Sequence, residues 1–319
     1  DPEWSAQSPD ELANAVGVVA NNSEDAVNGL AQGCYAIQSA THGTYITKKD
    51  DDSGYRFQIL PLANAESFFM KPTSLSNYLL TDRSGKHFAS EPIKHISSSS
   101  ANIFSEWKVT AVDNGDGEYD FRFKGNALNL TIRHGFDDKK LYFVDPNNLL
   151  NLESENTFRL ISQNNCTPFP EISTNVSGDT SALKGDANLP VRGFIDPHTH
   201  ISSNEFMGGK FLHGEPFNRW GVEKALQDSK IVHGNNGSLD LIGNIYGHAI
   251  DFTYDTRGWP DFPYWPKTDS LSHTGYYYKW IERAYLSGLR IMVTDLVENQ
   301  VLCTAQRTLN PLSWIGANS

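Results

Sequence analysis

The 319-residue sequence has no long hydrophobic run and little basic charge. No stretch approaches the 18 consecutive apolar residues of a transmembrane helix, so we expect none. The formal net charge is −12, from 26 Lys and Arg against 38 Asp and Glu. A nucleic-acid-binding protein needs a basic face to meet the phosphates, and no such run is visible. These absences argue against nucleic acid as a partner and against a membrane-spanning segment.

Methionine and cysteine are also scarce, with three residues of each. The chain begins with DPEW at positions 1–4, which is typical of an N-terminus left after a leader is removed. We therefore expect an exported protein, secreted or periplasmic. Cys34, Cys166 and Cys303 lie far apart and form no C-x-x-C pair, which argues against a cysteine-ligated metal site. An odd count leaves one thiol either unpaired or linked to another polypeptide.

Changes in composition and hydrophobic pattern divide the chain into four segments. Residues 1–33 are predicted to be a helical N-terminal segment, with a second short helix from Ser23, because capping residues precede apolar residues at helical spacing. Residues 34–166 carry short alternating runs cut by Gly, Asp, Asn and Ser, the pattern of an all-β domain. Residues 167–189 are a polar, Pro- and Gly-containing linker. Residues 190–319 change to a pattern of alternating strand and helix.

A threefold repeat is visible in the all-β segment. The sequence NYLLTD at 77–82 is similar to GTYITK at 43–48, and NALNLT at 126–131 is a looser copy. Three copies of about 40–50 residues resemble a β-trefoil, the architecture of ricin-B-type and fascin-type domains. A trefoil brings its two ends together, so this resemblance predicts a disulfide between Cys34 and Cys166. The alternative is two unpaired thiols.

The last segment has a motif that carries chemistry. A short strand at 191–195 leads into Asp196 and then into His198 and His200. Alternation along an extended chain points both imidazoles the same way. Such nitrogen pairs are ligands for divalent metals, and Asp196 is placed to orient one ring. On spacing alone, surface histidines also produce this pattern.

The segment after the motif predicts one βα unit of a parallel sheet. Apolar residues at helical spacing indicate an amphipathic helix over 277–285, and Gly288 ends it. A second strand at 289–293 follows and ends at Asp295.

Residues 193–200, GFIDPHTH, match the G-x-x-D-x-H-x-H signature of the amidohydrolase superfamily. The resemblance implies a TIM-type (β/α)8 barrel whose first units lie here, one or two zinc ions held by His198 and His200, and a metal-activated water. Residues 190–303 further resemble exported bacterial metal-dependent hydrolases, distantly like membrane dipeptidases. True dipeptidases carry H-x-D at this motif, so the chain departs from them.

Further candidates follow from their positions after the second strand and in the loop region. Asp295 and Glu298 follow the second strand and are candidates for the general acid/base, although each also fits a solvated loop acid. His248, Trp259 and Trp265 are candidates for contacts with a small-molecule or peptide-like substrate. The ordinary alternatives are a structural hydrogen bond for His248 and a packed lid for the two tryptophans.

A complete barrel takes about 250 residues, and residues 190–319 supply roughly half of them. We therefore expect a second polypeptide, produced by cleavage of a longer precursor, that carries the rest of the barrel and the usual general acid/base. Cys303 is then the thiol that links the two chains, and the alternative is a buried thiol.

Two functions from different classes follow. The first is a metal-dependent hydrolase whose amide, ester, lactone or phosphoester substrate the sequence does not specify. The alternative is a non-enzymatic protein that binds carbohydrate or protein through its trefoil domain. Lectin-like trefoils often carry a Q-x-W motif, and here Trp107 is the only tryptophan of the segment, without that motif.

Overall fold

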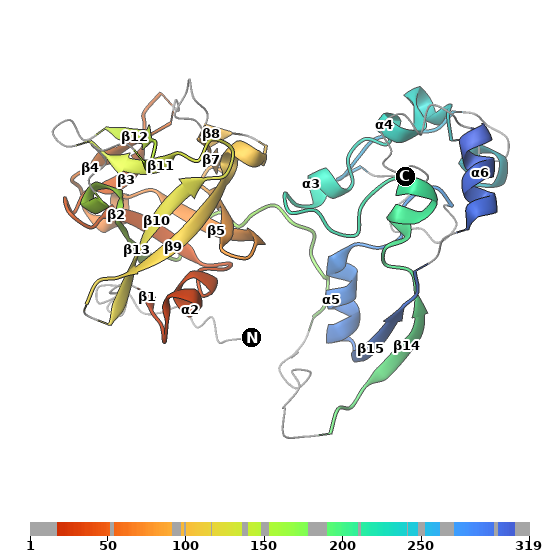
Figure 1. The fold of residues 1–319 in the computed structure, drawn as a ribbon, viewed down its shortest axis with the longest axis horizontal. Helices are drawn as coiled ribbons and strands as arrows, with labels where there is room; N and C mark the ends of the chain where they lie inside the picture. The colour runs from red at the N-terminus through yellow and green to blue at the C-terminus, as the bar shows by residue number, and fades with distance from the viewer. Residues whose placement is uncertain are drawn as a thin grey trace. The chain divides into compact units, whose positions relative to one another are not determined.

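The computed structural model describes residues 18–51, 54–90, 97–98, 100–115, 117–135, 140–147, 153–177, 190–209, 212–240, 242–247, 253–261, 271–296 and 299–309. Structural statements below concern these residues. The chain forms two compact units, one extending to Pro170 and the other beginning at Glu171 (Figure 1). The division falls inside the predicted linker, 167–189. Thr167 packs on the first unit, where its hydroxyl donates to the Arg83 carbonyl at 2.6 Å, and Glu171 accepts hydrogen bonds from Tyr277 in the second.

The first unit is built on a closed barrel of antiparallel strands. Each strand pairs with a neighbour on both sides, so the ring has no free edge. Its members, in ring order, are β2 (Cys34–Ser39), β5 (Ser67–Ser74), β6 (Asn77–Thr81), β9 (Glu106–Asp113), β10 (Glu118–Gly125) and β13 (Phe158–Ser162).

A hairpin joins the barrel three times, once in each repeat of the chain. The hairpins are β3 (Tyr45–Lys48) with β4 (Tyr55–Gln58), β7 (His87–Phe88) with β8 (Ser97–Ser98), and β11 (Thr131–His134) with β12 (Leu141–Val144). A 3-10 helix comes shortly before the last barrel strand of each repeat: η1 (Leu62–Asn64), η2 (Ile103–Ser105) and η3 (Glu153–Asn156). This threefold arrangement is the β-trefoil that the repeats predict.

Each repeat contributes one fully buried aromatic side chain from the same position of its last barrel strand. Phe68, Trp107 and Phe158 stand at or near the start of β5, β9 and β13, and each is fully buried. Alternation along each strand directs these side chains inward. Burying such a ring stabilises the fold by about 1.5–3 kcal/mol. The indole Nε1–H of Trp107 donates to the Phe88 carbonyl at 2.7 Å, so its polar group is also satisfied.

The predicted disulfide is confirmed. Cys34 opens β2, Cys166 follows β13, and their Cα atoms lie 5.7 Å apart in the bonded pair. The two residues come together because β13 pairs with β2 and closes the barrel.

The N-terminal segment is helical only in part. Helix α2 (Ser23–Asn28) begins at the predicted residue, and the Asn22 side chain caps it by accepting from the Asp25 amide at 2.9 Å. Strand β1 (Val18–Val19) instead pairs with β10, so the prediction of an all-helical segment over 1–33 is wrong there. Both β1 residues are β-branched valines, which favour strand over helix. Residues 1–17 lie outside the described part.

The second unit contains the predicted βα unit. Strands β14 (Phe194–Thr199) and β15 (Leu289–Thr294) pair in parallel, and α5 (Tyr278–Leu286) precedes β15. Both predicted strands and the predicted helix are therefore present, within a few residues of their expected bounds. Further helical elements complete the unit: η5 (Ser203–Gly209), α3 (Val222–Ala225), α4 (Lys230–His233), η6 (Asn235–Gly237), the π-helical η7 (Gly243–Gly247) and α6 (Gln300–Leu309).

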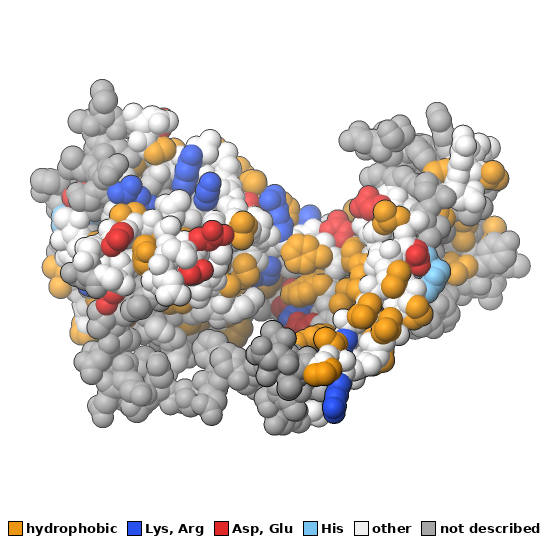
Figure 2. All heavy atoms as spheres, turned by 60° about the horizontal axis from the view of Figure 1, so that its bottom comes forward, with side chains coloured by type: hydrophobic (Ala, Val, Ile, Leu, Met, Phe, Trp, Pro, Cys, Tyr) orange, Lys and Arg blue, Asp and Glu red, His pale blue; other side chains and the backbone are white. Residues whose placement is uncertain are grey.

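The TIM-type barrel is not part of the observed fold. Among the described residues, β14 and β15 form a two-stranded sheet with no further strand beside them. This sheet leaves apolar side chains in solvent: Phe194, Ile195 and Ile291 are each at least 50% exposed. Hydrophobic side chains gather on this unit in Figure 2. A second polypeptide and its link through Cys303, which lies half-buried on α6, stay predictions.

No helix in the described residues has the length and apolar character needed to cross a bilayer.

Candidate functional site

The parallel strands bring the predicted metal ligands to one sheet end. Asp295 follows β15 directly, and its amide donates to the Thr199 carbonyl at 2.9 Å, while the Thr199 hydroxyl donates to the Val293 carbonyl at 2.9 Å. With Thr199 held against β15, His198 and His200 on either side share the opposite face. Asp295 and the two histidines therefore meet at the carboxyl ends of the strands.

The two imidazoles face each other through the same nitrogen. The Nε2 atoms of His198 and His200 lie 3.0 Å apart. On the other side of the rings, His198 Nδ1 lies 2.9 Å from the Asp295 carboxylate, and His200 Nδ1 lies 3.0 Å from the Asp295 carbonyl oxygen. Both of these partners accept hydrogen bonds and donate none, so we assign the proton of each neutral ring to Nδ1.

This assignment leaves two nitrogen lone pairs directed at each other. Lone pairs at such a distance repel unless a cation, either a proton or a metal ion, lies between them. Ligand nitrogens of a tetrahedral site with bonds of 2.0–2.1 Å are about 3.3 Å apart, close to the observed separation. The donor set therefore fits a divalent metal, for which two imidazoles supply half of a tetrahedral shell.

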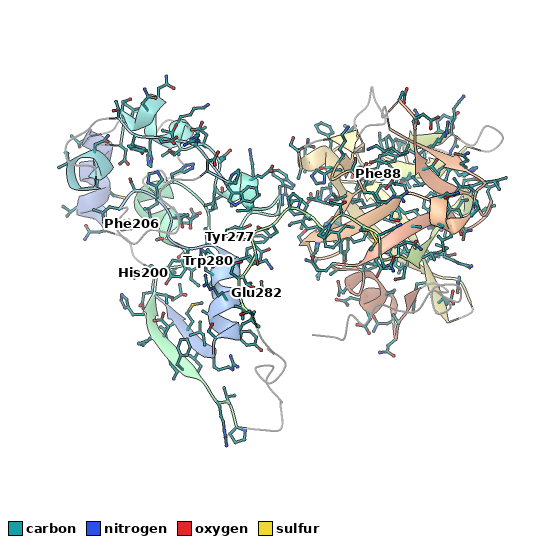
Figure 3. The ribbon with its side chains drawn as sticks, turned by 180° about the vertical axis from the view of Figure 1, so that it is seen from behind. Phe88, His200, Phe206, Tyr277, Trp280 and Glu282 are labelled. Carbon is teal, nitrogen blue, oxygen red and sulfur yellow. A yellow bond between two sulfur atoms is a disulfide. The ribbon has the colours of Figure 1, made fainter. Side chains whose placement is uncertain are left out.

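A small pocket opens beside the imidazole pair. It has a volume of 170 Å³ and is lined by His200, Ser202, Ser203, Phe206 and Asp295. Figure 3 shows His200 near the end of β14 and Phe206 close to it. The His198 side chain is 71% exposed, so the pair is open to solvent and to a bound molecule.

The other sequence candidates are not brought into this site by the described structure. Asp196 Oδ1 accepts from the His198 backbone amide at 3.2 Å, so it supports the backbone, and Asp295 contacts the ring instead. Trp259 packs against a small core that contains Leu226 and Tyr277. Glu298, His248 and Trp265 lie outside the described residues.

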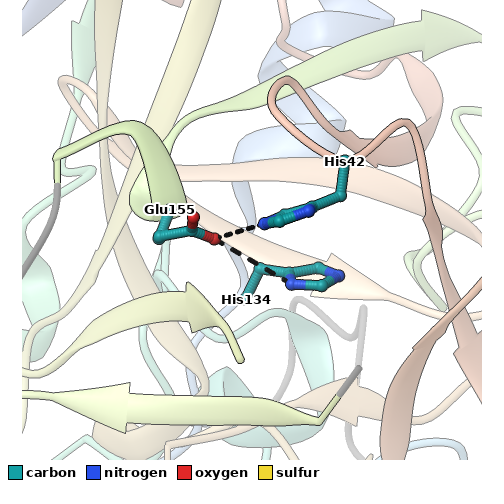
Figure 4. A group of neighbouring side chains, drawn as sticks. All are labelled: His42, His134 and Glu155. Atoms are coloured by element: carbon teal, nitrogen blue, oxygen red, sulfur yellow. Dashed lines mark hydrogen bonds and ion pairs between the residues drawn. The ribbon is translucent and has the colours of Figure 1, made fainter. Parts of the chain in front are cut away.

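A second histidine group lies in the trefoil domain, formed by His42, His134 and Glu155 (Figure 4). His42 Nε2 lies 2.7 Å from the Glu155 carboxylate, and the two imidazoles stack at 4.1 Å with an interplanar angle of 22°. A metal binds in the plane of each imidazole ring, and the planes of stacked rings do not converge on one point. The group is better explained as a partly buried hydrogen-bonded contact between the first and third repeats.

A cationic pocket in the trefoil was missed by the sequence reasoning. It has a volume of 340 Å³ and is lined by Lys108, Thr110, Arg122, Phe123, Lys124, Thr131, Pro146 and Asn156. Lys108 on β9 stands directly opposite Lys124 on β10, and Arg122 lies two residues along on the same strand face. Neither lysine forms an ion pair with a described residue. Three cations therefore share one face of a protein whose net charge is −12.

The trefoil provides its own internal comparison for this pocket. The cross-strand pair Lys108–Lys124 has two threefold equivalents, Phe69–Thr81 and Arg159–Gln38. Neither equivalent brings two cations together, so the fold does not require them at this position. Like charges directly opposite on a sheet are destabilising. The pair is therefore a property of this one face and not of the trefoil architecture.

The sequence did contain a signal for the pocket. The turn-forming run DNGDG at 113–117 predicts a hairpin between the strands on either side. Counting outward from its centre at Gly115 pairs Lys108 with Arg122, and the structure moves this register by two residues, which sets Lys108 opposite Lys124.

No sequence-family model and no curated protein matches the chain. The solved structures that match include a GlcNAcα1-4Gal-releasing endo-β-galactosidase from Clostridium perfringens, at 15% identity over 41% of this chain and 33% of that one, with a TM-score of 0.35. SeviL bound to asialo-GM1 saccharide matches at 12% identity over 41% of this chain and 98% of its own, with a TM-score of 0.35. The designed threefold-symmetric protein ThreeFoil matches at 16% identity over 41% and 99%, with a TM-score of 0.33.

The predicted family is corrected by the structure. The amidohydrolase assignment, with its zinc site on a TIM barrel, is wrong: no family model matches the chain, and among the described residues β14 and β15 form a two-stranded sheet and not part of a closed barrel. The physical reason is that the motif at 193–200 is short. It specifies a strand that ends in two converging imidazoles, which the structure contains, but it does not specify the strands that would follow.

Proposed function

We propose that the protein binds carbohydrate through its trefoil domain, and that the ligand is an acidic glycan bearing carboxylate or sulfate groups. The observation that supports this most directly is the face shared by Lys108, Arg122 and Lys124, which opens into the 340 Å³ pocket. Ammonium and guanidinium groups form their strongest hydrogen bonds with anionic oxygens. An anion between the two lysines would also relieve their mutual repulsion.

The rest of the pocket suits a sugar. Thr110, Thr131 and Asn156 offer hydroxyl and amide groups that can exchange hydrogen bonds with sugar hydroxyls. Phe123 also lines the pocket but is fully buried, so no broad aromatic face is available for sugar stacking. Recognition would therefore depend on charge, in agreement with the missing Q-x-W motif. Binding of this kind weakens as salt concentration rises.

The test compares glycans that differ only in charge. Isothermal titration calorimetry of the full chain with 3′-sialyllactose, 3′-sulfolactose and lactose should show binding of the acidic glycans alone. The double variant Lys108→Gln/Lys124→Gln should weaken that binding by at least about tenfold. Arg159→Gln is the matched control, because it removes a cation from a threefold-equivalent position outside the pocket. Equal binding of lactose, or unchanged affinity in the double variant, contradicts the proposal.

A second candidate function is the binding of a divalent transition metal by His198 and His200. It is supported by the two Nε2 atoms that face each other at 3.0 Å, with Asp295 accepting at both Nδ1 positions. Co²⁺ titration followed by visible absorption tests it, since nitrogen-ligated Co²⁺ has characteristic bands. We expect His198→Asn/His200→Asn to lose one equivalent of Co²⁺, and an unchanged stoichiometry contradicts the assignment.

A further inference from the structure

A loop-rich region of the second unit, residues 212–277, has a small hydrophobic core among its described residues. Its described helices have three to five residues each, and its buried hydrophobic core consists of Val222, Ala225, Leu226 and Tyr277. The region contains no cysteine, so no disulfide can supplement this core. Small folds of this kind commonly depend on a bound metal.

Three histidines are buried together in this region. His213, His233 and His273 are each 3% exposed, although histidine is usually only partly buried. The ring centroids of His233 and His273 lie 4.9 Å apart, and those of His213 lie 5.9 and 6.1 Å from them. The rings meet edge-on at 62–77°, unlike the stacked pair in the trefoil. Edge-on rings can direct nitrogen atoms at a common point.

A buried carboxylate completes the group. Asp240 is 4% exposed, and its Oδ2 atom lies 3.8 Å from His233 Nδ1. One ligand atom from each of His233, Asp240 and His273 lies within 4.8 Å of the others. The ligand atoms of a tetrahedral metal are about 3.3 Å apart, so small side-chain movements bring all three within bonding distance of one ion.

Hydrogen bonds around the group orient the carboxylate. The Tyr254 hydroxyl donates to Asp240 Oδ2 at 3.0 Å, the Ser272 hydroxyl donates to the same atom, and the Gly243 amide donates to Oδ1 at 2.9 Å. Because the Tyr254 hydrogen goes to Asp240, its oxygen accepts from His233 Nδ1 at 2.6 Å. Partners of this kind commonly surround the ligands of a metal site.

The ligand types of the group suit a transition-metal ion. Its possible ligands are two imidazoles and one carboxylate, and mixed imidazole and carboxylate ligands suit divalent transition metals. His213 is not counted among them, because its Nε2–H donates to the Gln227 carbonyl at 2.6 Å.

We propose that His233, Asp240 and His273 bind one divalent transition-metal ion, which stabilises the fold of the second unit. Tyr254 lies beside the ion and either keeps its hydrogen bond to Asp240 or becomes a fourth ligand. When His233 Nδ1 binds the ion, the ring carries its proton on Nε2 instead, and the hydrogen bond from Nδ1 to Tyr254 is given up. The ion joins segments that are far apart in the sequence, at 230–240, 253–256 and 271–274.

The experiment uses the full chain, stripped with a chelator and then titrated with Co²⁺. The variant His198→Asn/His200→Asn removes the exposed imidazole pair, so any remaining equivalent of Co²⁺ reports the buried group alone. We expect one equivalent to remain, with visible absorption bands, and to raise the midpoint of thermal unfolding by about 5–10 °C. Adding Asp240→Asn, which keeps the side-chain shape, should abolish both effects.

Two results would overturn the proposal. One is a His198→Asn/His200→Asn protein that binds no Co²⁺ and unfolds at the same temperature with and without metal. This result is informative even if variants of the buried group fail to fold, because it leaves that group unchanged. The other is an Asp240→Asn variant that folds and still holds its equivalent of Co²⁺. The glycan titrations are independent of both results, because the cationic pocket belongs to the other unit.

Discussion

Lys108 on β9 and Lys124 on β10 are direct cross-strand neighbours on the outside of the trefoil barrel. The two residues that occupy the equivalent positions one repeat earlier are Phe69 and Thr81. Because the fold does not require two lysines here and their repulsion lowers stability, we attribute the pair to ligand binding. Replacing one of them should therefore change stability and glycan affinity in opposite directions.

Replacing Lys124 by threonine, the residue of the preceding repeat, should stabilise the trefoil while it weakens acidic-glycan binding. Relief of the like-charge contact is expected to raise the free energy of unfolding by about 0.2–1 kcal/mol. Urea unfolding at low and high salt measures it, and the gain should shrink at high salt. A loss of stability together with unchanged glycan binding would refute this account of the pair.

Removal of the disulfide should destabilise the trefoil markedly. The bond joins residues separated by 132 positions, so it greatly restricts the unfolded chain. Cys34→Ala/Cys166→Ala is expected to lower the free energy of unfolding by about 2–5 kcal/mol in denaturant titrations. Cys303→Ala is the control, since this residue lies in the other unit, and it should leave trefoil stability unchanged.

Truncation of Trp107 should destabilise the trefoil strongly. Trp107→Ala removes a fully buried ring and leaves the Phe88 carbonyl without its indole donor. We expect a loss of about 3–5 kcal/mol in the free energy of unfolding. Trp107→Phe should cost clearly less, because Phe68 and Phe158 show that phenylalanine fits the other two repeats. Equal losses from both variants would contradict the threefold packing.

The trefoil should lose stability as the pH falls from 6.5 towards 4. Burial lowers the pKa of His87 from 6.5 to about 4, against an opposing effect of nearby Asp82. The unfolded chain therefore binds the proton more readily, and stability is lost on acidification through this window by about 3 kcal/mol. His87→Gln should flatten the profile measured by urea unfolding. His198→Gln, an exposed histidine of the other unit, should leave it unchanged.

The sequence predicted local structure and the repeat well. The threefold pattern gave the trefoil and, through it, the pairing of Cys34 with Cys166. The run around His198 and the spacing over 277–285 gave β14 and α5, because strand ends and amphipathic helices depend on near neighbours.

What the sequence did not predict depends on contacts between distant residues. The buried group of His233, Asp240 and His273 comes from loops without periodic pattern, so no spacing rule brings its members together. The superfamily resemblance failed because it depended mainly on a short motif. Residues 193–200 correctly predicted a strand that ends in two histidines, but a TIM barrel needs many further strands that this motif does not specify. For the cationic pocket, the turn at 113–117 indicates which strands pair, but the pairing of Lys108 with Lys124 differs by two residues from the register that its centre gives.

The disulfide between Cys34, at the start of β2, and Cys166, after β13, also determines how the chain transmits mechanical force. Tension applied between β2 and the polypeptide beyond residue 166 passes through the two sulfur atoms and bypasses the hydrogen bonds of the barrel. Under a pull from the C-terminal side, the segment beyond the crosslink would extend first, and the trefoil would keep its shape until the load became large enough to break the covalent bond.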